Sequence, residues 1–219
     1  EAVGHDLIDS TEMYLRIVLE LEEEGVPALR ARLAERLHLS APSVSEGVSR
    51  LEEQGLLLLT EERTVELTDR GRTWAESVMR KHRLAERLLA DVIGLPPEHL
   101  HEEACRWEHV ISDRVEARIA ELLGDPTTSP YGNPIPGSAV AGPRPVPLAD
   151  AGSGEVVLHS LSESLQPDED VIGALHRAGL IAGAAARAEA GADGVVLHGV
   201  DGAVPLSAEQ ARLVFVHPS

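Results

Sequence analysis

Cysteine and aromatic residues are scarce in this chain of 219 residues: aromatics make up 2% of it, and Cys105 is the one cysteine. A single cysteine excludes an intramolecular disulfide framework and fits a reducing cytosol. The cores must be built from Leu, Val, Ile and Ala. The longest apolar run, residues 178–186, is too short to span a bilayer, and the N-terminus lacks a signal-peptide pattern. The sequence therefore predicts a soluble, cytoplasmic protein with no membrane partner.

Basic residues are also few. The 19 Lys and Arg residues stand against 37 Asp and Glu residues, which gives a formal net charge of −18. This balance excludes nucleic-acid binding by bulk electrostatic attraction, so any DNA binding must come from a local basic face. Bound divalent cations would relieve the repulsion where carboxylates crowd together.

The richest group of metal-binding side chains lies around the one cysteine. Glu108 and His109 follow Cys105 at the third and fourth positions, and on a helix these positions share one face. Sulfur, oxygen and nitrogen donors that meet at one point favour Fe²⁺, Co²⁺, Ni²⁺ or Zn²⁺, whereas Mg²⁺ and Ca²⁺ prefer oxygen alone. The alternative interpretation is that Cys105 is a buried apolar residue of an amphipathic helix.

A second donor set lies upstream of the first. His82 and Glu86 stand four positions apart, and His101 comes shortly before the cysteine. Taken alone, the pair is typical of a solvated helix edge. Because two donor clusters occur in adjacent segments, each at helical spacing, the pattern favours a metal-binding region over that alternative.

The N-terminal third has the element order of a winged helix-turn-helix. Residues 6–24 and 30–37 show helical periodicity, and Ser40 and Pro42 begin a further helix that runs to about residue 54. Two short apolar runs, at 57–60 and 64–67, then flank a turn and predict a β-hairpin. The alternative is a generic small α+β domain.

The rest of the chain divides into a helical part and a β-rich part. Residues 72–123 are predicted to be helical, and they carry more apolar faces than a short helical hairpin can bury, so we expect a dimer interface. Pro, Gly and Ser are frequent between 125 and 154, which is typical of a linker. Beyond it, short apolar runs at 156–158, 195–197 and 214–216 predict a small β domain, with one helix near 169–178.

Several longer motifs resemble one family, the iron-dependent regulators of actinobacteria typified by the diphtheria toxin repressor. The resemblance covers residues 6–137 closely. It implies an α+β multidomain fold: a winged helix-turn-helix DNA-binding domain (1–73), a helical metal-binding and dimerisation domain (74–140), a flexible linker (141–153) and an SH3-like β-barrel domain (154–219). The motifs are the segments at 9–16, 29–32, 79–89, 105–110 and 132–137.

The resemblance also implies two metal sites per subunit and a neighbouring anion site. Through these sites it predicts an ion that holds the first helix against the dimer core and so sets the spacing of the two recognition helices. The main-chain carbonyl of Cys105 or a water would complete the primary site. The implied primary ligands are Met13, Cys105, Glu108 and His109; the ancillary ligands are His82, Glu86, His101, Glu163 and Gln166; the anion-binding residues are Arg83, Ser129 and Asn133.

DNA reading is implied for the helix that begins near Ser40. Two acidic residues, Glu46 and Glu53, stand where close relatives have Gln and Arg. A carboxylate can accept a hydrogen bond from cytosine N4 but repels phosphate, so we expect an altered operator preference and weaker, more salt-sensitive binding. The implied DNA contacts are Arg30, Arg32, Ser40, Pro42, Ser43, Ser45, Glu46, Arg50 and Arg63.

These features predict an Fe²⁺-activated transcriptional repressor of iron homeostasis genes, not an enzyme, with two Fe²⁺ per subunit. Co²⁺, Ni²⁺, Zn²⁺ or Mn²⁺ should substitute in vitro. The expected partners are a second copy of the chain and palindromic double-stranded operator DNA, with one or two dimers per operator. The alternatives are a Mn²⁺-responsive regulator of the same family, a structural-zinc scaffold that binds no DNA, and a metallohydrolase built on the same ligands.

Overall fold

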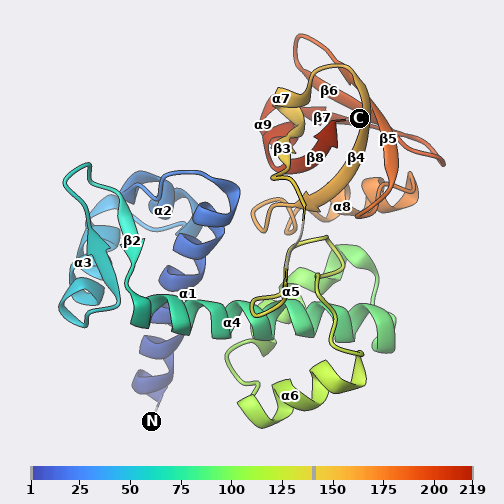
Figure 1. Cartoon of the computed structure of the whole chain (residues 1–219). Helices are drawn as coiled ribbons and strands as arrows, with labels where there is room; N and C mark the ends of the chain where they lie inside the picture. Colours follow the sequence, from blue (N-terminus) through green and yellow to red (C-terminus); the bar gives the residue numbers. More distant parts are fainter. Residues whose placement is uncertain (1, 140–141, 219) are drawn as a thin grey trace. The chain divides into compact units, whose positions relative to one another are not determined.

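The computed structural model describes the backbone of residues 2–139 and 142–218, and the side chains of these residues from Ser10 onward. The chain forms two compact units, Glu1–Arg80 and Lys81–Ser219, which are described separately below (Figure 1). In the described part of the chain, every helix is too short or too polar to cross a membrane.

The first unit is the winged helix-turn-helix that the sequence predicts. Ser40 caps the third helix by accepting a hydrogen bond from the backbone N–H of Ser43, with a proline in the first turn. The two wing strands pair antiparallel, with Leu57 opposite Leu67. Apolar side chains from all three helices and the wing form one core. The elements are α1 (Ala2–Glu24), α2 (Arg30–Leu37), α3 (Ala41–Glu53), β1 (Leu57–Leu59) and β2 (Val65–Leu67), followed by α4 (Asp69–Leu88), which continues into the second unit.

The helical segment predicted at 72–123 is interrupted at two places in the second unit. Gly94 adopts a left-handed conformation (φ 76°) and two prolines follow it, so the chain turns. A second break separates Trp107 from Asp113. The segments after α4 are a π-helical turn (Leu89–Ile93), a 3-10 turn (Pro97–His99), α5 (Leu100–Trp107) and α6 (Asp113–Leu122).

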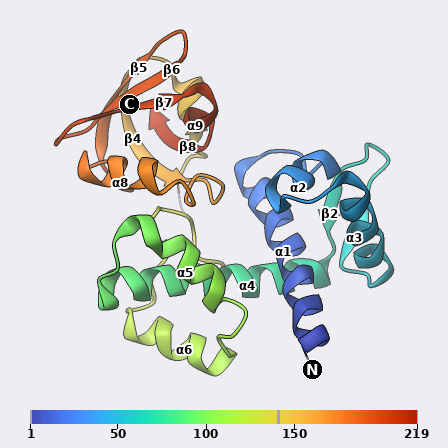
Figure 2. The ribbon, with the colours of Figure 1, turned by 180° about the vertical axis from the view of Figure 1, so that it is seen from behind.

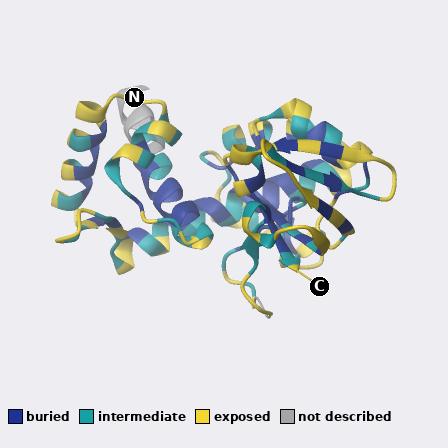
Figure 3. Cartoon of the chain, turned by 90° about the horizontal axis from the view of Figure 1, so that it is seen from above, coloured by how far each residue is buried: buried dark blue, intermediate teal, exposed yellow. Residues whose placement is uncertain are grey.

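The C-terminal part of the second unit is a curved six-stranded antiparallel sheet in the order β3-β8-β4-β5-β6-β7 (Figures 1 and 2). Buried residues alternate with partly exposed ones along β6 and with exposed ones along β7, as a sheet with one covered face requires (Figure 3). The elements are β3 (Val146–Pro147), α7 (Leu148–Ala151), β4 (Gly154–Leu161), α8 (Glu169–Arg177), β5 (Ala185–Ala190), β6 (Gly194–His198), β7 (Ala203–Ser207), α9 (Ala208–Arg212) and β8 (Val214–Pro218).

The segment expected to be a flexible linker, 141–153, contains regular structure. Residues 140–141, where the helical domain was expected to end and the linker to begin, lie outside the described residues. After them, Val146 and Pro147 pair with β8, and Leu148 is buried in the core of the sheet. A Pro-rich composition therefore marks an edge strand here as well as a connection.

One apolar core joins the helices and the sheet of the second unit. It includes Ala85 and Leu89 from the α4 end, Leu100 from α5, and Leu161 and Leu165 from the sheet side. This shared core places the turn after β4 against α4 and α5, and the candidate metal ligands lie there.

Candidate metal centre

A fully buried group of two imidazoles and two carboxylates lies where α4, α5 and the turn after β4 meet. His82 and Glu86 are one turn apart on α4, His101 is on α5, and Glu163 follows β4. His82 Nε2 lies 2.8 Å from Glu86 Oε1 and 3.4 Å from Glu163 Oε2. His101 Nδ1 lies 3.4 Å from the same Glu163 oxygen. Candidate ligand atoms of all four lie within 4.8 Å of one another.

Gln166 completes the set expected for the ancillary site. Its Oε1 lies 2.8 Å from His101 Nδ1. Its amide nitrogen donates to the carbonyl of Leu161, at 3.0 Å, and to Asn133 Oδ1, at 3.1 Å. These two bonds fix which end of the amide faces the imidazole. The structure thus brings together all five residues of the expected ancillary set, two of them from the turn after β4.

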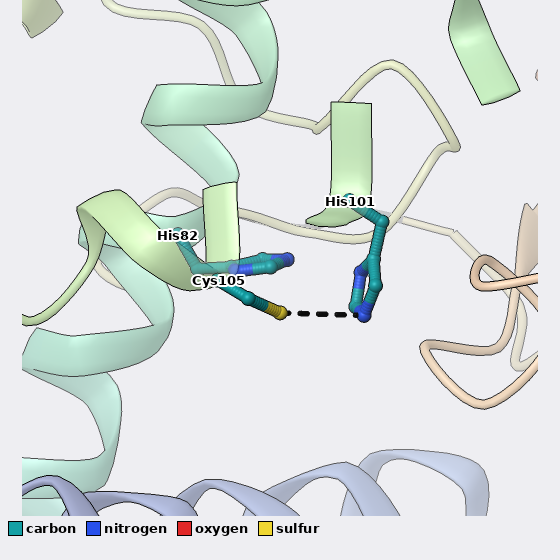
Figure 4. A group of neighbouring side chains, drawn as sticks. All are labelled: His82, His101 and Cys105. Carbon is teal, nitrogen blue, oxygen red and sulfur yellow. Dashed lines mark hydrogen bonds between the residues drawn. The ribbon is translucent and has the colours of Figure 1, made fainter. Parts of the chain in front are cut away.

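Cys105 lies beside the same imidazoles. It stands one helical turn after His101 on α5, and its Sγ is 3.5 Å from His101 Nε2 (Figure 4). The rings of His82 and His101 meet edge to face, with centroids 5.0 Å apart. His82, His101 and Cys105 form a second group with candidate ligand atoms within 4.8 Å. The thiol and the two imidazoles therefore converge, a combination that suits a borderline-soft divalent metal.

Glu108 and His109 lie at the C-terminal end of α5. α5 ends at Trp107, so Glu108 caps the helix and His109 lies in the turn beyond it. Glu108 Oε2 is 2.6 Å from His82 Nδ1, and its Oε1 is 3.3 Å from His109 Nε2. Among the described residues, the Cys105 thiol lies close to His82 and His101, whereas Glu108 contacts His82 and His109. The assignment of Cys105, Glu108 and His109 to one primary site remains a prediction.

The electrostatics of the cluster are those of a buried network of ion pairs. Burial lowers the pKa of His82, but Glu86 and Glu108 raise it more, so it lies well above 6.5. Burial likewise opposes charge on His101, and contacts with Cys105 and Glu163 outweigh it, so this pKa is also raised well above 6.5. For Glu163, burial raises the pKa, but the two imidazoles and Arg83 lower it well below 4.5.

The hydrogen bonding of two carboxylate oxygens indicates whether a cation fits this donor set. Glu86 Oε2 and Glu163 Oε2 are buried, and neither has a hydrogen-bond partner among the described residues. A buried acceptor without a donor is costly, and a divalent cation is the partner that such oxygens and neighbouring imidazole nitrogens share. The residues present therefore fit a transition-metal ion.

Met13 lies on α1 in the first unit and is half-buried. Its two neighbours in the chain are anchored within that unit. Glu12 accepts a hydrogen bond from Trp74 Nε1 at 3.0 Å, and Tyr14 Oη lies 3.4 Å from the carbonyl oxygen of Ser43. Because the other candidate ligands belong to the second unit, the part of Met13 in a primary site remains a prediction.

The three expected anion-binding residues hold the turn that carries Glu163 and Gln166. Arg83 Nε lies 3.1 Å from Glu163 Oε1, and this guanidinium also donates to the carbonyl of Pro134. Asn133 Nδ2 donates to the carbonyl of Leu161 at 3.0 Å. Ser129 in turn donates to Asn133 Oδ1. Sequence reasoning missed this supporting role, and their anion-binding role remains a prediction.

The expected DNA contacts all lie in the first unit, on α2, α3 and the wing. Arg63 stands at the wing tip with a left-handed backbone (φ 63°). Ser40 and Ser43 are exposed at the start of α3, and Glu46 is exposed one turn further on. Ser45, Arg50, Arg30 and Arg32 are partly exposed, and Arg32 also donates to the carbonyl of Pro27. Their contacts with DNA remain predictions.

Comparison with known families decides between the interpretations left open by the sequence. Residues 6–65 match the N-terminal DNA-binding domain of the iron-dependent repressors, and residues 68–137 match the metal-binding and dimerisation domain of the same proteins. The chain belongs to the iron-dependent repressor family. The structural-zinc scaffold and the metallohydrolase lose their support, since members of this family are transcriptional repressors.

Individual relatives agree with this assignment. The iron-dependent repressor IdeR of Mycobacterium tuberculosis is 54% identical over 189 residues, 81% of this chain and 82% of that protein. The diphtheria toxin repressor of Corynebacterium diphtheriae is 50% identical over 175 residues, 75% of this chain and 77% of that protein. A solved manganese-dependent transcriptional repressor in complex with manganese is 30% identical with a TM-score of 0.81, and covers 95% of this chain and 100% of its own. IdeR of T. acidophilum is 26% identical with a TM-score of 0.76, over 95% of this chain and 98% of that one.

Proposed function

We propose that this protein is an Fe²⁺-activated repressor that binds palindromic double-stranded operator DNA as a homodimer and controls iron homeostasis genes. The observation that carries the proposal is the buried cluster of His82, Glu86, His101 and Glu163, in which one buried oxygen of each carboxylate has no hydrogen-bond partner among the described residues and suits a cation. It lies in a chain that also holds a winged helix-turn-helix. We assign no catalytic residues. Because operator DNA is its partner, we place the protein in the cytoplasm.

The residues divide into two proposed ligand sets. Met13, Cys105, Glu108 and His109 make the primary set; His82, Glu86, His101, Glu163 and Gln166 make the ancillary set, for two ions per subunit. A bound divalent cation would supply the positive charge that these carboxylates and the thiol share, and coordination bonds that tie Met13 to the dimerisation domain. In the ancillary set, Arg83 and Asn133 hold Glu163 and Gln166 in place.

Dimerisation is supported by apolar side chains on the surface of the helical part. Val92, Ile93, Val115 and Leu122 are all exposed large hydrophobic residues, and such residues in a domain matched by a dimerisation family favour burial against a second copy. A dimer would present two α3 helices to two half-sites of a palindrome. We expect one or two dimers per operator.

Iron and manganese are the two candidate activators. A thioether and a thiolate in the primary set favour Fe²⁺ and later metals over Mn²⁺. The second candidate, a Mn²⁺-responsive regulator, draws support from the solved neighbour that is described as manganese-dependent. It also draws on the nitrogen and oxygen donors of the ancillary set. The role of Cys105 separates the two, because only the Fe²⁺ proposal requires the sulfur.

A gel-shift experiment tests the proposed function. A palindromic duplex, selected from random sequence with the wild-type protein and anaerobic Fe²⁺, is titrated with protein in Fe²⁺, in Mn²⁺ and with a chelator. We expect retardation with Fe²⁺, loss with the chelator, and loss with Cys105→Ala although that variant remains a folded dimer. Glu102→Gln, an exposed position on the same helix, is the matched control and should behave as wild type. Undiminished retardation by Cys105→Ala, or retardation in the chelator, would refute the proposal.

A further inference from the structure

The residue that follows Met13 in the chain packs directly on the recognition helix. Tyr14 lies on α1 and is 2% exposed. Its phenol oxygen lies 3.4 Å from the backbone carbonyl oxygen of Ser43, in the first turn of α3. Ser43 is also one of the exposed residues at the proposed DNA-reading end of that helix. One side chain of α1 thus reaches the backbone of the segment that would face DNA.

The contact is so close that α3 needs a glycine at this point. A Cβ added at Gly47 would lie 2.4 Å from Tyr14 Oη and 2.5 Å from Cζ. Glycine inside a helix is otherwise unfavourable. The Tyr14 ring explains the glycine at position 47, because the ring fills the space that a side chain there would need. The aromatic ring cannot swing away freely, because it is part of the same densely packed core as the fully buried Val44 and Val48 of α3.

The same part of α1 also contacts α4. Glu12 accepts a hydrogen bond from Trp74 of α4 at 3.0 Å. Met13 therefore stands between a residue bound to α4 and a residue packed on α3. Because an α-helix is stiff along its backbone, a shift or rotation of α1 that moves Met13 also moves the phenol against the backbone of α3. No side chain at Gly47 lies between the two to absorb the movement.

We propose that Tyr14 is a positioning residue that transmits the state of Met13 to the recognition helix through its contact with Gly47. The inference rests on the proposed function, in which Met13 is a metal ligand. It adds the route by which that ligand acts on DNA binding. Metal and DNA would then be coupled through one packed aromatic contact within the first unit. Thermodynamic linkage requires the coupling to work in both directions, so operator DNA should raise the affinity for Fe²⁺ by the factor by which Fe²⁺ raises the affinity for DNA.

The experiment measures this coupling factor rather than DNA affinity alone. Fe²⁺ is titrated anaerobically into the full-length protein by calorimetry, with and without a saturating palindromic duplex selected with the wild-type protein. The ratio of the two apparent dissociation constants is the coupling factor. We expect it to be about 5- to 150-fold in the wild type, the usual range for coupled sites. Urea denaturation of each variant is measured alongside to establish that it is folded.

Four variants separate transmission from simple structural support. Gly47→Ala forces the ring from its place, and Tyr14→Leu keeps apolar volume but removes the ring. Both should reduce the coupling factor to about 1. Tyr14→Phe keeps the ring contact and should retain most of the factor. Ser49→Ala changes an exposed residue of the same helix and should leave the factor unchanged.

The possible results distinguish this inference from the proposed function. If Gly47→Ala or Tyr14→Leu is folded and weakens DNA binding but keeps the wild-type coupling factor, Tyr14 merely stabilises the unit and the inference is wrong. If one of the two does not fold, the other decides. If the wild-type protein itself shows no coupling between Fe²⁺ and the duplex, it is the proposed function that fails.

Discussion

Gly132 offers the sharpest test of how the sheet is held against the helices of the second unit. Its φ is 88°, and an added Cβ would lie 2.0 Å from the backbone oxygen of His159 and 3.0 Å from Ala182. The next backbone link is a hydrogen bond of 3.0 Å from the N–H of Leu161 to the carbonyl of Tyr131. The chain segment at 131–132 is therefore pressed directly onto β4, just before the turn that carries Glu163.

The expected cost of Gly132→Ala has two parts. A non-glycine residue in the left-handed region costs about 1–2 kcal/mol. An atom forced into a packed contact costs about 1–3 kcal/mol more, and the obstacle here is a backbone carbonyl that cannot rotate away. The sum, about 2–5 kcal/mol, is a large share of the 5–15 kcal/mol that typically stabilises a domain. We expect the second unit to lose about that much stability towards urea.

Gly124→Ala is the matched control. Its φ is 72°, but an added Cβ would meet no described heavy atom within 4 Å, so it should cost only the conformational part, about 1–2 kcal/mol. Hydrogen exchange at β4 and calorimetric titration with Fe²⁺ extend the comparison. In Gly132→Ala, amide protection of β4 should fall and the weaker site for Fe²⁺ should lose affinity. Equal destabilisation by the two substitutions would refute the close approach of Gly132 to β4.

Three further predictions concern separate parts of the chain. Glu46→Gln should raise affinity for the selected duplex, because Glu46 is exposed on α3 and a carboxylate repels phosphate; unchanged affinity and sequence preference would remove Glu46 from the interface. Burial and the facing His217 lower the pKa of His159 below 6.5, so the unfolded chain takes up this proton more readily. Stability should therefore fall as the pH drops below 6.5, and a thermal-melting series with His159→Asn should lose that part of the fall. Tyr131→Phe removes the 2.6 Å hydrogen bond to the carbonyl of Pro97 and should cost about 0.5–1.5 kcal/mol in urea denaturation; no measurable loss would show that water replaces the bond.

The sequence predicts those parts of the fold whose signals are local. The winged helix-turn-helix follows from helical periodicity, the Ser40 cap and two short apolar runs. The helix at Glu169–Arg177 also lies where it was expected. The pairing of Val146 and Pro147 with β8 was not predicted, because it joins residues about 70 positions apart and proline normally ends a strand.

The same distinction between local and long-range signals applies to the candidate metal site. The spacing of His82 and Glu86 on one helix predicted that these two side chains lie together. The family resemblance supplied Glu163 and Gln166, and the fold brings these two residues to the pair on α4. After Cys105, helical spacing predicts one site for Cys105, Glu108 and His109, but it did not predict that α5 ends at Trp107 or that Glu108 contacts His82 of α4. A helix end fixed by tertiary packing leaves no clear signal in a run such as residues 105–109.

The contact between His82 and Glu108 changes what single substitutions at the two proposed metal sites can reveal. His82 Nδ1 lies 2.6 Å from Glu108 Oε2, while its Nε2 faces Glu86 at 2.8 Å. One imidazole of the ancillary set is thus bound to a carboxylate of the primary set. If the two sets were independent, the effects of His82→Gln and Glu108→Gln on Fe²⁺-dependent DNA binding would add, with the larger loss from Glu108→Gln.

Because the two side chains touch, we expect the double variant to lose less than the sum of the single losses. The expected interaction energy is about 0.5–3 kcal/mol. Glu102→Gln combined with His82→Gln serves as the additive control, since Glu102 is exposed and contacts Arg106 on the surface of α5. Strict additivity of His82→Gln and Glu108→Gln would mean that this hydrogen bond does not link the two sites. A larger loss from His82→Gln than from Glu108→Gln would instead invert the primary and ancillary roles, because the residue that activates DNA binding must cost more when it is removed.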